Sequence, residues 1–281
     1  MIPAPIITRA VTLALEEDLS GGDITTSALV AEGSRAVGRA LAKSRLVACG
    51  AEVFARVFYE LDPGIRVERK VADGAEVAPG TVLWEVEGAT RTILAGERTA
   101  LNFVQRMSGV ATLTRRFVEA VPPGSKLRVT DTRKTTPGLR AFERYAVRTG
   151  GGTNHRDDLG SAILIKDNHI EAAGGITPAL ASARRFAPHT SKLEIEVESL
   201  AALDEALAAG ADIVMLDNFE PEALSEAVRR ASGRALIEVS GGVGLERVAE
   251  LARAGVDVVS VGALTHSAPA ADISLDIERL S

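Results

Sequence analysis

The chain has 281 residues, of which 46% are hydrophobic and 25% charged, proportions that are ordinary for a globular protein with a buried core. Its formal net charge of −6 argues against a general nucleic-acid-binding protein, whose binding domain is normally basic. No stretch approaches about 18 consecutive apolar residues and no secretory signal is visible, so we expect neither a membrane span nor export. Cys49 is the single cysteine, which excludes an internal disulfide and favours a reducing, cytoplasmic location.

The first part of the chain predicts a small domain that mixes helices with short strands. A helix is expected from Ile7 to Asp18, and the alternating residues of RAVGRALAK and GIRVERKV are typical of strands. The segment VADGAEVAPGTVLWEVEG predicts two short strands joined by a Gly/Pro turn. The amphipathic stretch GERTALNFVQRMSGVATLTRRFVEAV then predicts a long helix that connects this domain to the next.

From Leu127 onwards the pattern becomes regular. Short apolar, β-branched runs recur in LRVTDTR, AILIKDN, LEIEVES, DIVMLDN, ALIEVSG and DVVSVGAL, and helical patterns separate the later ones. Strands that alternate with helices predict parallel βαβ units and, at this spacing, a (β/α) barrel. Because only about six strands are recognisable, we expect an irregular or incomplete barrel, and an open doubly wound sheet is the alternative. The expected division is a first domain over residues 1–110 and a barrel over residues 111–269.

Basic residues follow several of these runs, at the strand ends where barrel enzymes build their active sites. The chain has 26 arginines but only 6 lysines, so a lysine retained in a polar cluster suggests that an amine is needed there. A solvated basic loop is the alternative explanation for any one pair of cations. Together the cations predict a pocket for a small polyanion, since guanidinium and ammonium groups bind carboxylate and phosphate. The residues are Arg133, Lys134, His155, Arg156 and Lys166.

Carboxylates end two further runs. Glu194, Glu196 and Glu198 share one face of LEIEVES, and cannot all point into an apolar core. Asp217 ends IVMLD without a nearby countercharge in sequence. Such carboxylates can hold Mg²⁺ together with substrate phosphates, or accept hydrogen bonds from ribose hydroxyls. Ion pairs with the cations described above are the alternative interpretation.

Small residues follow the last two runs, where barrel enzymes commonly bind phosphate through backbone N–H groups. These residues are Ser240, Gly241, Gly242 and Gly262. The sequence contains no Walker A motif, no GxGxxG after a strand and no Cys/His metal set. The single cysteine lies far from the polar clusters, so nucleophilic catalysis by a thiol is not expected.

In order and spacing, these motifs resemble the quinolinate phosphoribosyltransferase family. The resemblance rests on DTRKTTPGLR, RYAVRTGGGTNHR, LIKDNHI, EVES, MLDNF, EVSGG and VGALTHSAPAADISL, with LEEDLSGGDITT and GERTALNFVQRMSGVAT in the first domain. It implies an N-terminal α/β sandwich, with the tail 270–281 packed on it, an irregular (β/α) barrel and a homodimer. The implied reaction transfers phosphoribosyl from phosphoribosyl pyrophosphate to quinolinate with Mg²⁺. Nicotinate mononucleotide for NAD biosynthesis, pyrophosphate and CO₂ are the products.

The resemblance also implies a role for each site residue. Arg133, His155, Arg156 and Lys166 would bind the quinolinate carboxylates, with Thr132 in the same site. Lys134 would serve both the carboxylate and the phosphate ends. Glu196 and Asp217 would meet the ribose hydroxyls and the metal, and with the two lysines they are the expected catalytic residues. Ser240, Gly241, Gly242 and Gly262 would hold the 5′-phosphate, and Arg98 would enter the site of the neighbouring subunit.

Two other functions remain open from the sequence. A molybdenum-transport-associated relative shares the TTPG and HR segments, and would act on a different acid. A barrel that binds a phosphorylated sugar without catalysis is the alternative from another class, because a fold does not determine a function. Turnover of quinolinate, compared with nicotinate, separates these possibilities.

Overall fold

The computed structural model describes residues 1–280 as two compact units. The first unit contains residues 1–115 and 135–151, together with the chain from 264 to the end of the described part. The second contains residues 116–134 and 152–263. The expected boundary at residue 110 falls inside helix α4 (Thr90–Glu119), whose helical pattern runs through it without a break. Within residues 1–280, no helix is both long and apolar enough to cross a membrane.

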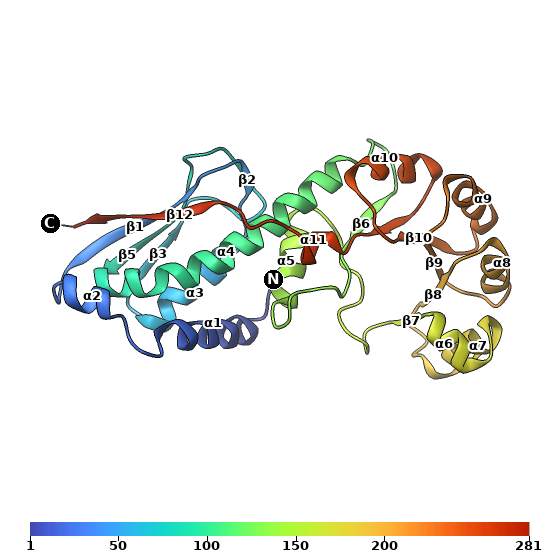
Figure 1. The fold of residues 1–281 in the computed structure, drawn as a ribbon, viewed down its shortest axis with the longest axis horizontal. Helices are drawn as coiled ribbons and strands as arrows, with labels where there is room; N and C mark the ends of the chain where they lie inside the picture. Colours follow the sequence, from blue (N-terminus) through green and yellow to red (C-terminus); the bar gives the residue numbers. More distant parts are fainter. Residues whose placement is uncertain (281) are drawn as a thin grey trace. The chain divides into compact units, whose positions relative to one another are not determined.

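The first unit mixes six helices with six strands in the described chain, counting the short α11 (Ala263–His266), of which all but the first residue lies in this unit. Its helices are α1 (Ala4–Leu19), α2 (Ile24–Leu29), α3 (Ala51–Leu61), the larger part of α4, and α5 (Arg140–Thr149). Its strands are β1 (Arg35–Ala42), β2 (Leu46–Val47), β3 (Arg66–Arg69), β4 (Glu76–Val77), β5 (Val82–Ala89) and β12 (Ile273–Arg279). The main sheet has the antiparallel order β12-β1-β5-β3, and β2 pairs with β4. The chain's last strand thus pairs with its first (Figure 1).

Aromatic side chains pack helix α3 into the core of the first unit. Trp84 on β5 stacks on Phe54 with ring centroids 5.2 Å apart, and Phe54 meets Phe58 edge-on at 5.0 Å. All three side chains are fully buried, and aromatic side chains bury more apolar surface per residue than most others, so they stabilise this core strongly. A Cβ at Gly96 would come within 2.8 Å of the Phe58 ring, so glycine lets α4 approach α3 closely.

The second unit is the predicted parallel α/β structure. Its strands are β6 (Arg128–Thr130), β7 (Ile163–Ile165), β8 (Leu193–Val197), β9 (Ile213–Asp217), β10 (Leu236–Ser240) and β11 (Val258–Ser260). Its helices are α6 (Asp167–Ala173), α7 (Ile176–Phe186), α8 (Leu200–Ala208), α9 (Pro221–Ala231) and α10 (Leu245–Ala254), and the short α11 (Ala263–His266) begins at its last residue. Helices α7 to α10 follow one another along the outside of the strands (Figure 1).

The strands hydrogen-bond in the parallel order β6-β11-β10-β9-β8-β7. In the described chain, no ladder joins the outer strands β6 and β7, so the barrel is irregular, as the sequence predicts. An isolated parallel bridge between Thr130 and Thr153 instead lays the segment after the three glycines beside β6. The predicted fold class, an N-terminal α/β sandwich with an irregular (β/α) barrel, is confirmed.

Candidate active site

Strand register places the polar residues of the second unit on one face of its sheet. Glu196 on β8 pairs with Met215 on β9, which pairs with Glu238 on β10, and Asp217 pairs with Ser240. Because side chains of paired residues in parallel strands point the same way, these groups share a face with Glu194, two residues before Glu196. Glu194 and Glu238 are buried, whereas Glu196, Asp217 and Ser240 at or near the strand ends are partly exposed.

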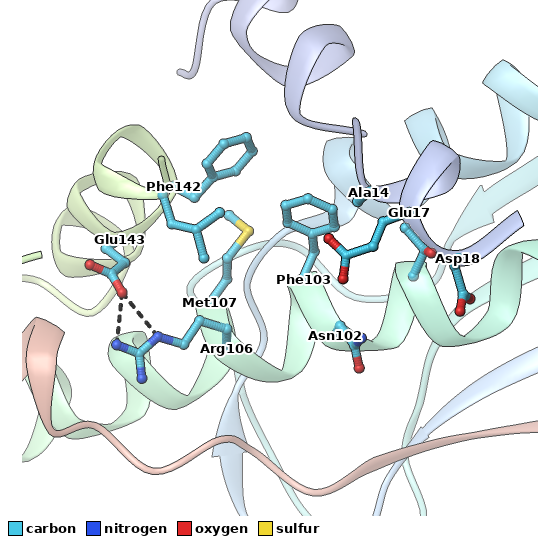
Figure 2. A pocket seen from close by; sticks show the side chains of 11 residues that line it. Ala14, Glu17, Asp18, Asn102, Phe103, Arg106, Met107, Phe142 and Glu143 are labelled. Carbon is cyan, nitrogen blue, oxygen red and sulfur yellow. Dashed lines mark hydrogen bonds and ion pairs between the residues drawn. The ribbon is translucent and has the colours of Figure 1, made fainter. Parts of the chain in front are cut away.

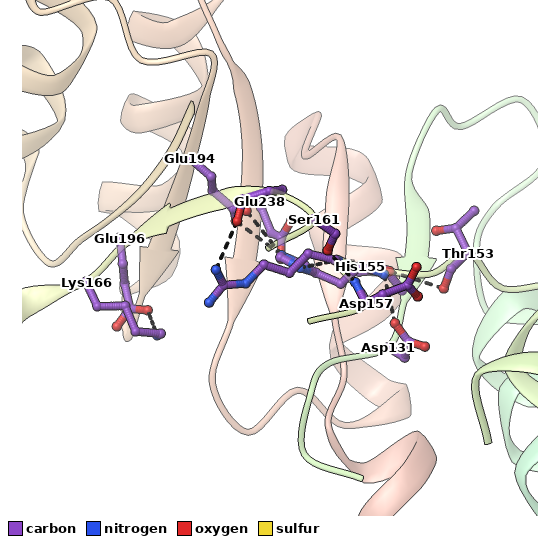
Figure 3. A network of polar contacts seen from close by, with 12 residues as sticks. Asp131, Thr153, His155, Asp157, Ser161, Lys166, Glu194, Glu196 and Glu238 are labelled. Carbon is purple, nitrogen blue, oxygen red and sulfur yellow. Dashed lines mark hydrogen bonds and ion pairs between the residues drawn. The ribbon is translucent and has the colours of Figure 1, made fainter. Parts of the chain in front are cut away.

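Lys166 and Glu196 form an ion pair at the carboxyl ends of adjacent strands β7 and β8. The Nζ of Lys166 contacts Oε2 of Glu196, and the two side chains are 44% and 17% exposed (Figure 3). Lys166 immediately precedes α6, and its backbone N–H donates to Nδ1 of His169 at 3.0 Å. A half-exposed ammonium beside a carboxylate can exchange that partner for a substrate anion at little cost, because exposed ion pairs are weak.

His155 lies deeper, between two buried carboxylates. Its Nε2 is 3.2 Å from Oε2 of Glu194 and 3.5 Å from Oε1 of Glu238, and Figure 3 shows both glutamates directed at the ring. Burial alone lowers the pKa of His155, but its hydrogen bonds and charge interactions with both glutamates outweigh burial and raise that pKa to about 10. Burial likewise raises the pKa of Glu194, and the charge of Glu238 adds to this effect.

The chain around His155 is fixed to the end of β6. Buried Asp131 accepts the backbone N–H of His155 at 2.8 Å and the amide of Asn154 at 2.6 Å. The backbone N–H of Thr153 donates to the Val129 carbonyl at 2.8 Å. These bonds hold the residues that precede Arg156 in an extended path along the barrel strand.

Arg156 and Arg133 are close enough for their charges to interact. Burial lowers the pKa of the Arg156 guanidinium, and the positive charge of Arg133 lowers it further. The negative charges of Glu194 and Asp158 raise this pKa, but by less. Two guanidinium groups that repel each other at a barrel mouth are what a bound dianion would stabilise. Lys134 is exposed, and its backbone N–H donates to Thr132 Oγ1 at 3.1 Å, which shapes the turn after β6.

The residues after β9 and β10 form a narrow approach to Asp217. Gly241 has φ +95°, and a Cβ there would lie 2.9 Å from Oδ1 of Asp217 and 3.2 Å from Oδ1 of Asn218. Asn218 is itself in the left-handed region, with φ +55°, and its Nδ2 donates to Asp217 at 3.0 Å. Glycine at 241 therefore leaves backbone N–H groups and the Asp217 carboxylate open to a ligand without a Cβ between them.

The first unit carries its own hollow of ≈200 Å³ (Figure 2). Phe103, Met107 and Phe142 line it beside a buried ion pair in which Arg106 donates to Glu143, with Nη2 and Oε1 2.7 Å apart. Glu143 also accepts the backbone N–H of Thr136 at 3.0 Å and the hydroxyl of Thr136 at 2.7 Å. These bonds anchor the TTPG turn, which follows Lys134 in the chain.

The structure therefore gathers most of the predicted site residues in one unit. Arg98 is the exception, because it lies exposed on α4 in the first unit. Sequence reasoning missed Glu238, a lone acidic residue inside the apolar run ALIEVSG, and gave Asp131 no role. The signal for Glu238 was its spacing, two residues before Ser240 on the same face of the strand. The proposed contacts with substrate stay predictions.

Comparisons with known proteins match this arrangement. Residues 23–108 match a family profile described as the quinolinate phosphoribosyl transferase N-terminal domain, and residues 110–276 match that of the C-terminal domain. A probable nicotinate-nucleotide pyrophosphorylase (carboxylating) of Methanocaldococcus jannaschii is 45% identical over 94% of this chain and 95% of its own. A nicotinate-nucleotide pyrophosphorylase (carboxylating) of Mycobacterium leprae is 46% identical, with 94% of each chain covered.

Among solved structures, this chain is similar to that of NadC from Streptococcus pyogenes. It superposes with a TM-score of 0.96 at 41% sequence identity, over 100% of this chain and 99% of its own. Profile matches to both domains and identities well above 30% across nearly the whole length agree with the arrangement of the strand-end residues. The chain belongs to the quinolinate phosphoribosyltransferase family.

Proposed function

We propose that this chain transfers the phosphoribosyl group of phosphoribosyl pyrophosphate to quinolinate, with loss of pyrophosphate and CO₂, in NAD biosynthesis. The observation that carries the proposal is the barrel mouth itself. One unit carries both the cations and the carboxylates that the reaction needs, at or just after the carboxyl ends of its strands. The cations are Arg133, Arg156 and Lys166, and the carboxylates are Glu196 and Asp217. Relatives named quinolinate phosphoribosyltransferase (decarboxylating), from Nicotiana tabacum and Nicotiana glauca, are 38% and 39% identical over 95% of this chain.

The charges suggest how the reaction proceeds. The cations would bind and orient the two quinolinate carboxylates, so that the pyridine nitrogen faces the anomeric carbon. As pyrophosphate departs, positive charge develops on the ribose ring, and Glu196 or Asp217 would stabilise it. The new nitrogen–carbon bond makes the pyridine cationic, and this charge stabilises the electron pair left on the adjacent ring carbon as CO₂ leaves. That carbon then takes up a proton from water to give nicotinate mononucleotide. No protein general base is needed, because no proton is removed in forming the bond.

The residues present also fit Mg²⁺. Glu196 and Asp217 supply the carboxylate oxygens that this hard cation prefers, and Gly241 leaves the Asp217 carboxylate accessible. Within residues 1–280, the one trio of side chains with metal-ligand spacing is His155, Glu194 and Glu238, so Glu196 and Asp217 would need substrate oxygens to complete a Mg²⁺ shell. When bound there, Mg²⁺ would neutralise charge on the departing pyrophosphate.

We also propose a homodimer in which Arg98 completes the partner's site, and a cytoplasmic location. Arg98 is exposed on α4 of the first unit, outside the unit that carries the other site residues. The single cysteine, Cys49, is buried, and burial raises the pKa of its thiol well above the usual range, as suits an unreactive thiol.

Incubation of the purified protein with Mg²⁺, phosphoribosyl pyrophosphate and quinolinate tests the function. We expect nicotinate mononucleotide, pyrophosphate and CO₂ in equal amounts, and no product when nicotinate replaces quinolinate. Turnover of nicotinate but not quinolinate would contradict the substrate assignment. Tight binding of both substrates with no product would favour the non-catalytic barrel.

A further inference from the structure

His155 lies in a three-residue cluster with Glu194 and Glu238, and neither glutamate has a role in the reaction described above. These side chains are nearly inaccessible: 12% of His155, 6% of Glu194 and 4% of Glu238 is exposed. Two carboxylates inside a barrel are costly unless they meet a cation or a hydrogen-bond donor. The His155 ring, which comes from a segment outside the sheet, supplies a hydrogen bond to Glu194 and a charge contact to Glu238. Among the described residues, Glu238 Oε1 has no hydrogen-bond partner, so the ring at 3.5 Å is the polar group that faces it.

The cluster ties this segment to the middle of the barrel. Glu194 lies on β8 and Glu238 on β10, so the ring bridges two strands that are separated by β9. Nε2–H is present both in the neutral tautomer that donates to Glu194 and in the charged ring, so the hydrogen bond to Glu194 does not depend on which form is populated. At the other end, Asp131 holds the His155 backbone N–H at 2.8 Å.

Arg156 follows directly in the chain. Its backbone N–H lies 2.7 Å from Nδ1 of His155, and its Nη1 donates to the Ala162 carbonyl at 3.1 Å. The ring of His155 therefore holds the backbone of Arg156, and the Ala162 carbonyl holds its guanidinium group. If His155 were not held, the segment that contains Arg156 would lose its attachment to β8 and β10.

We propose that Glu194 and Glu238 are positioning residues, which clamp the His155 ring inside the barrel and thereby hold Arg156 at the mouth for the substrate's carboxylates. This inference rests on the proposed function, in which Arg156 binds quinolinate. It assigns His155 a role through Arg156, whether or not the ring itself touches the substrate. Neither glutamate needs to contact substrate, metal or the reacting atoms.

Isosteric neutral variants test the clamp. In Glu238→Gln the KM for quinolinate should rise about 10- to 100-fold, because small misplacements of a binding group cost that much. The KM for phosphoribosyl pyrophosphate should stay within about twofold, because the Asp217 side of the site is unaffected. Glu222→Gln, an equal change of charge on the exposed face of α9, is the matched control and should behave as wild type.

A double-mutant cycle with Arg156→Ala distinguishes positioning from an independent effect. If Glu238 acts through Arg156, Glu238→Gln should not raise the quinolinate KM further in the Arg156→Ala background. The same fold-increase in both backgrounds would overturn the proposal, as would a wild-type quinolinate KM in Glu238→Gln alone. Should Glu238→Gln fail to fold, the cycle is run with Glu194→Gln, which weakens the nearer of the two contacts with the ring.

The cluster also has the spacing of a metal site, with ligand atoms within 4.8 Å of one another. Metal analysis of the purified wild-type protein separates the two explanations. A stoichiometric transition metal that is lost in Glu238→Gln would overturn the clamp, whereas its absence supports a hydrogen-bonded ring. If the wild type does not turn over quinolinate, the proposed function fails. If it does and both neutral variants match it, only this inference fails.

Discussion

Two ion-paired centres on the same barrel strand differ in depth and in consequence. Glu196 pairs with Lys166 near the end of β8, and Glu194, about 6.6 Å further down the strand, faces His155. The Lys166 side chain is 44% exposed, whereas the His155 side chain is 12% exposed. Each centre sets a basic side chain against glutamate, one in the outer centre and two in the deeper one, and the clearest difference between them is access to solvent.

The difference in depth assigns different tasks to the two centres. An exposed ion pair contributes about 0–1 kcal/mol, so a substrate anion can replace Glu196 as the partner of Lys166 without destabilising the fold. A buried carboxylate that loses its partner costs about 3–5 kcal/mol, so the deeper centre must stay intact during turnover. We therefore expect variants at the mouth to lose activity, and variants in the deeper centre to lose stability or geometry as well.

The largest effect is expected at the mouth lysines. Replacing Lys166 or Lys134 with Ala should lower kcat/KM about 30- to several-thousand-fold, since each lost contact to a dianion costs about 2–5 kcal/mol. The melting temperature should change little, because Lys166 is half-exposed and Lys134 exposed. Steady-state kinetics and thermal unfolding of the same preparations measure both quantities.

Lysine-to-arginine variants sharpen this result. A planar guanidinium does not fit where a compact ammonium binds, so Lys166→Arg should recover little of the activity. Wild-type kinetics in either alanine variant would remove that lysine from the site. A large drop in melting temperature would show instead that the pair with Glu196 is structural.

The next prediction distinguishes the residues that bind Mg²⁺–phosphoribosyl pyrophosphate from those that bind quinolinate. Glu196→Gln and Asp217→Asn should weaken binding of Mg²⁺–phosphoribosyl pyrophosphate about 10- to 100-fold, the value of a hydrogen bond to a charged group. Quinolinate binding should survive in both variants, because its carboxylates meet the cations. Titration calorimetry with each substrate measures this, and the reverse pattern would contradict the assignment of these carboxylates to ribose and metal.

The sequence predicted the parallel strands and the mouth residues because both follow local patterns. Each barrel strand is an apolar run closed by polar residues, and Lys166, Asp217 and Ser240 occur where those runs end. The deeper centre was predicted only in part: His155 and Glu194 stood out in the sequence, but a single glutamate inside ALIEVSG, Glu238, does not reveal which side chain it will meet. Its partner, His155, is remote in sequence, and only the register of β8, β9 and β10 brings the three together.

Helix α5 was missed for a related reason. RAFERYAVRT contains charged residues that suggest a surface segment, yet Glu143 and Arg144 are buried. Glu143 is satisfied by Arg106 on α4 and by Thr136, contacts that no local pattern predicts. The placement of residues 135–151 in the first unit follows from such long-range bonds.

A smaller effect would show whether a second chain completes the mouth. Arg98→Ala and Lys134→Ala should each be inactive as homodimers. Co-expression pairs them at random, so about half of the dimers are mixed and each has one intact site, which returns roughly a quarter of wild-type activity. Differently tagged subunits verify that mixed dimers form. Mixed dimers without activity would place Arg98 in its own chain's site or outside any site.

The last effect concerns the proton on His155. The pKa of about 10 in the folded chain lies above the ordinary value of 6.5, so the charged ring stabilises the fold fully below pH 6.5. That stability is lost as pH rises towards 10, by up to about 1.4 kcal/mol per pH unit, because the folded chain retains a proton that the unfolded chain has released. The Arg156 N–H, 2.7 Å from Nδ1, opposes this second proton, since it needs a lone pair there. We expect the two buried carboxylates to stabilise the charged ring more than the single Arg156 N–H stabilises the neutral one, so the ring should stay charged. Titration of the His155 ring by NMR, assigned by its loss in His155→Gln, measures the outcome: a ring that is already neutral at pH 7 would show that the N–H prevails.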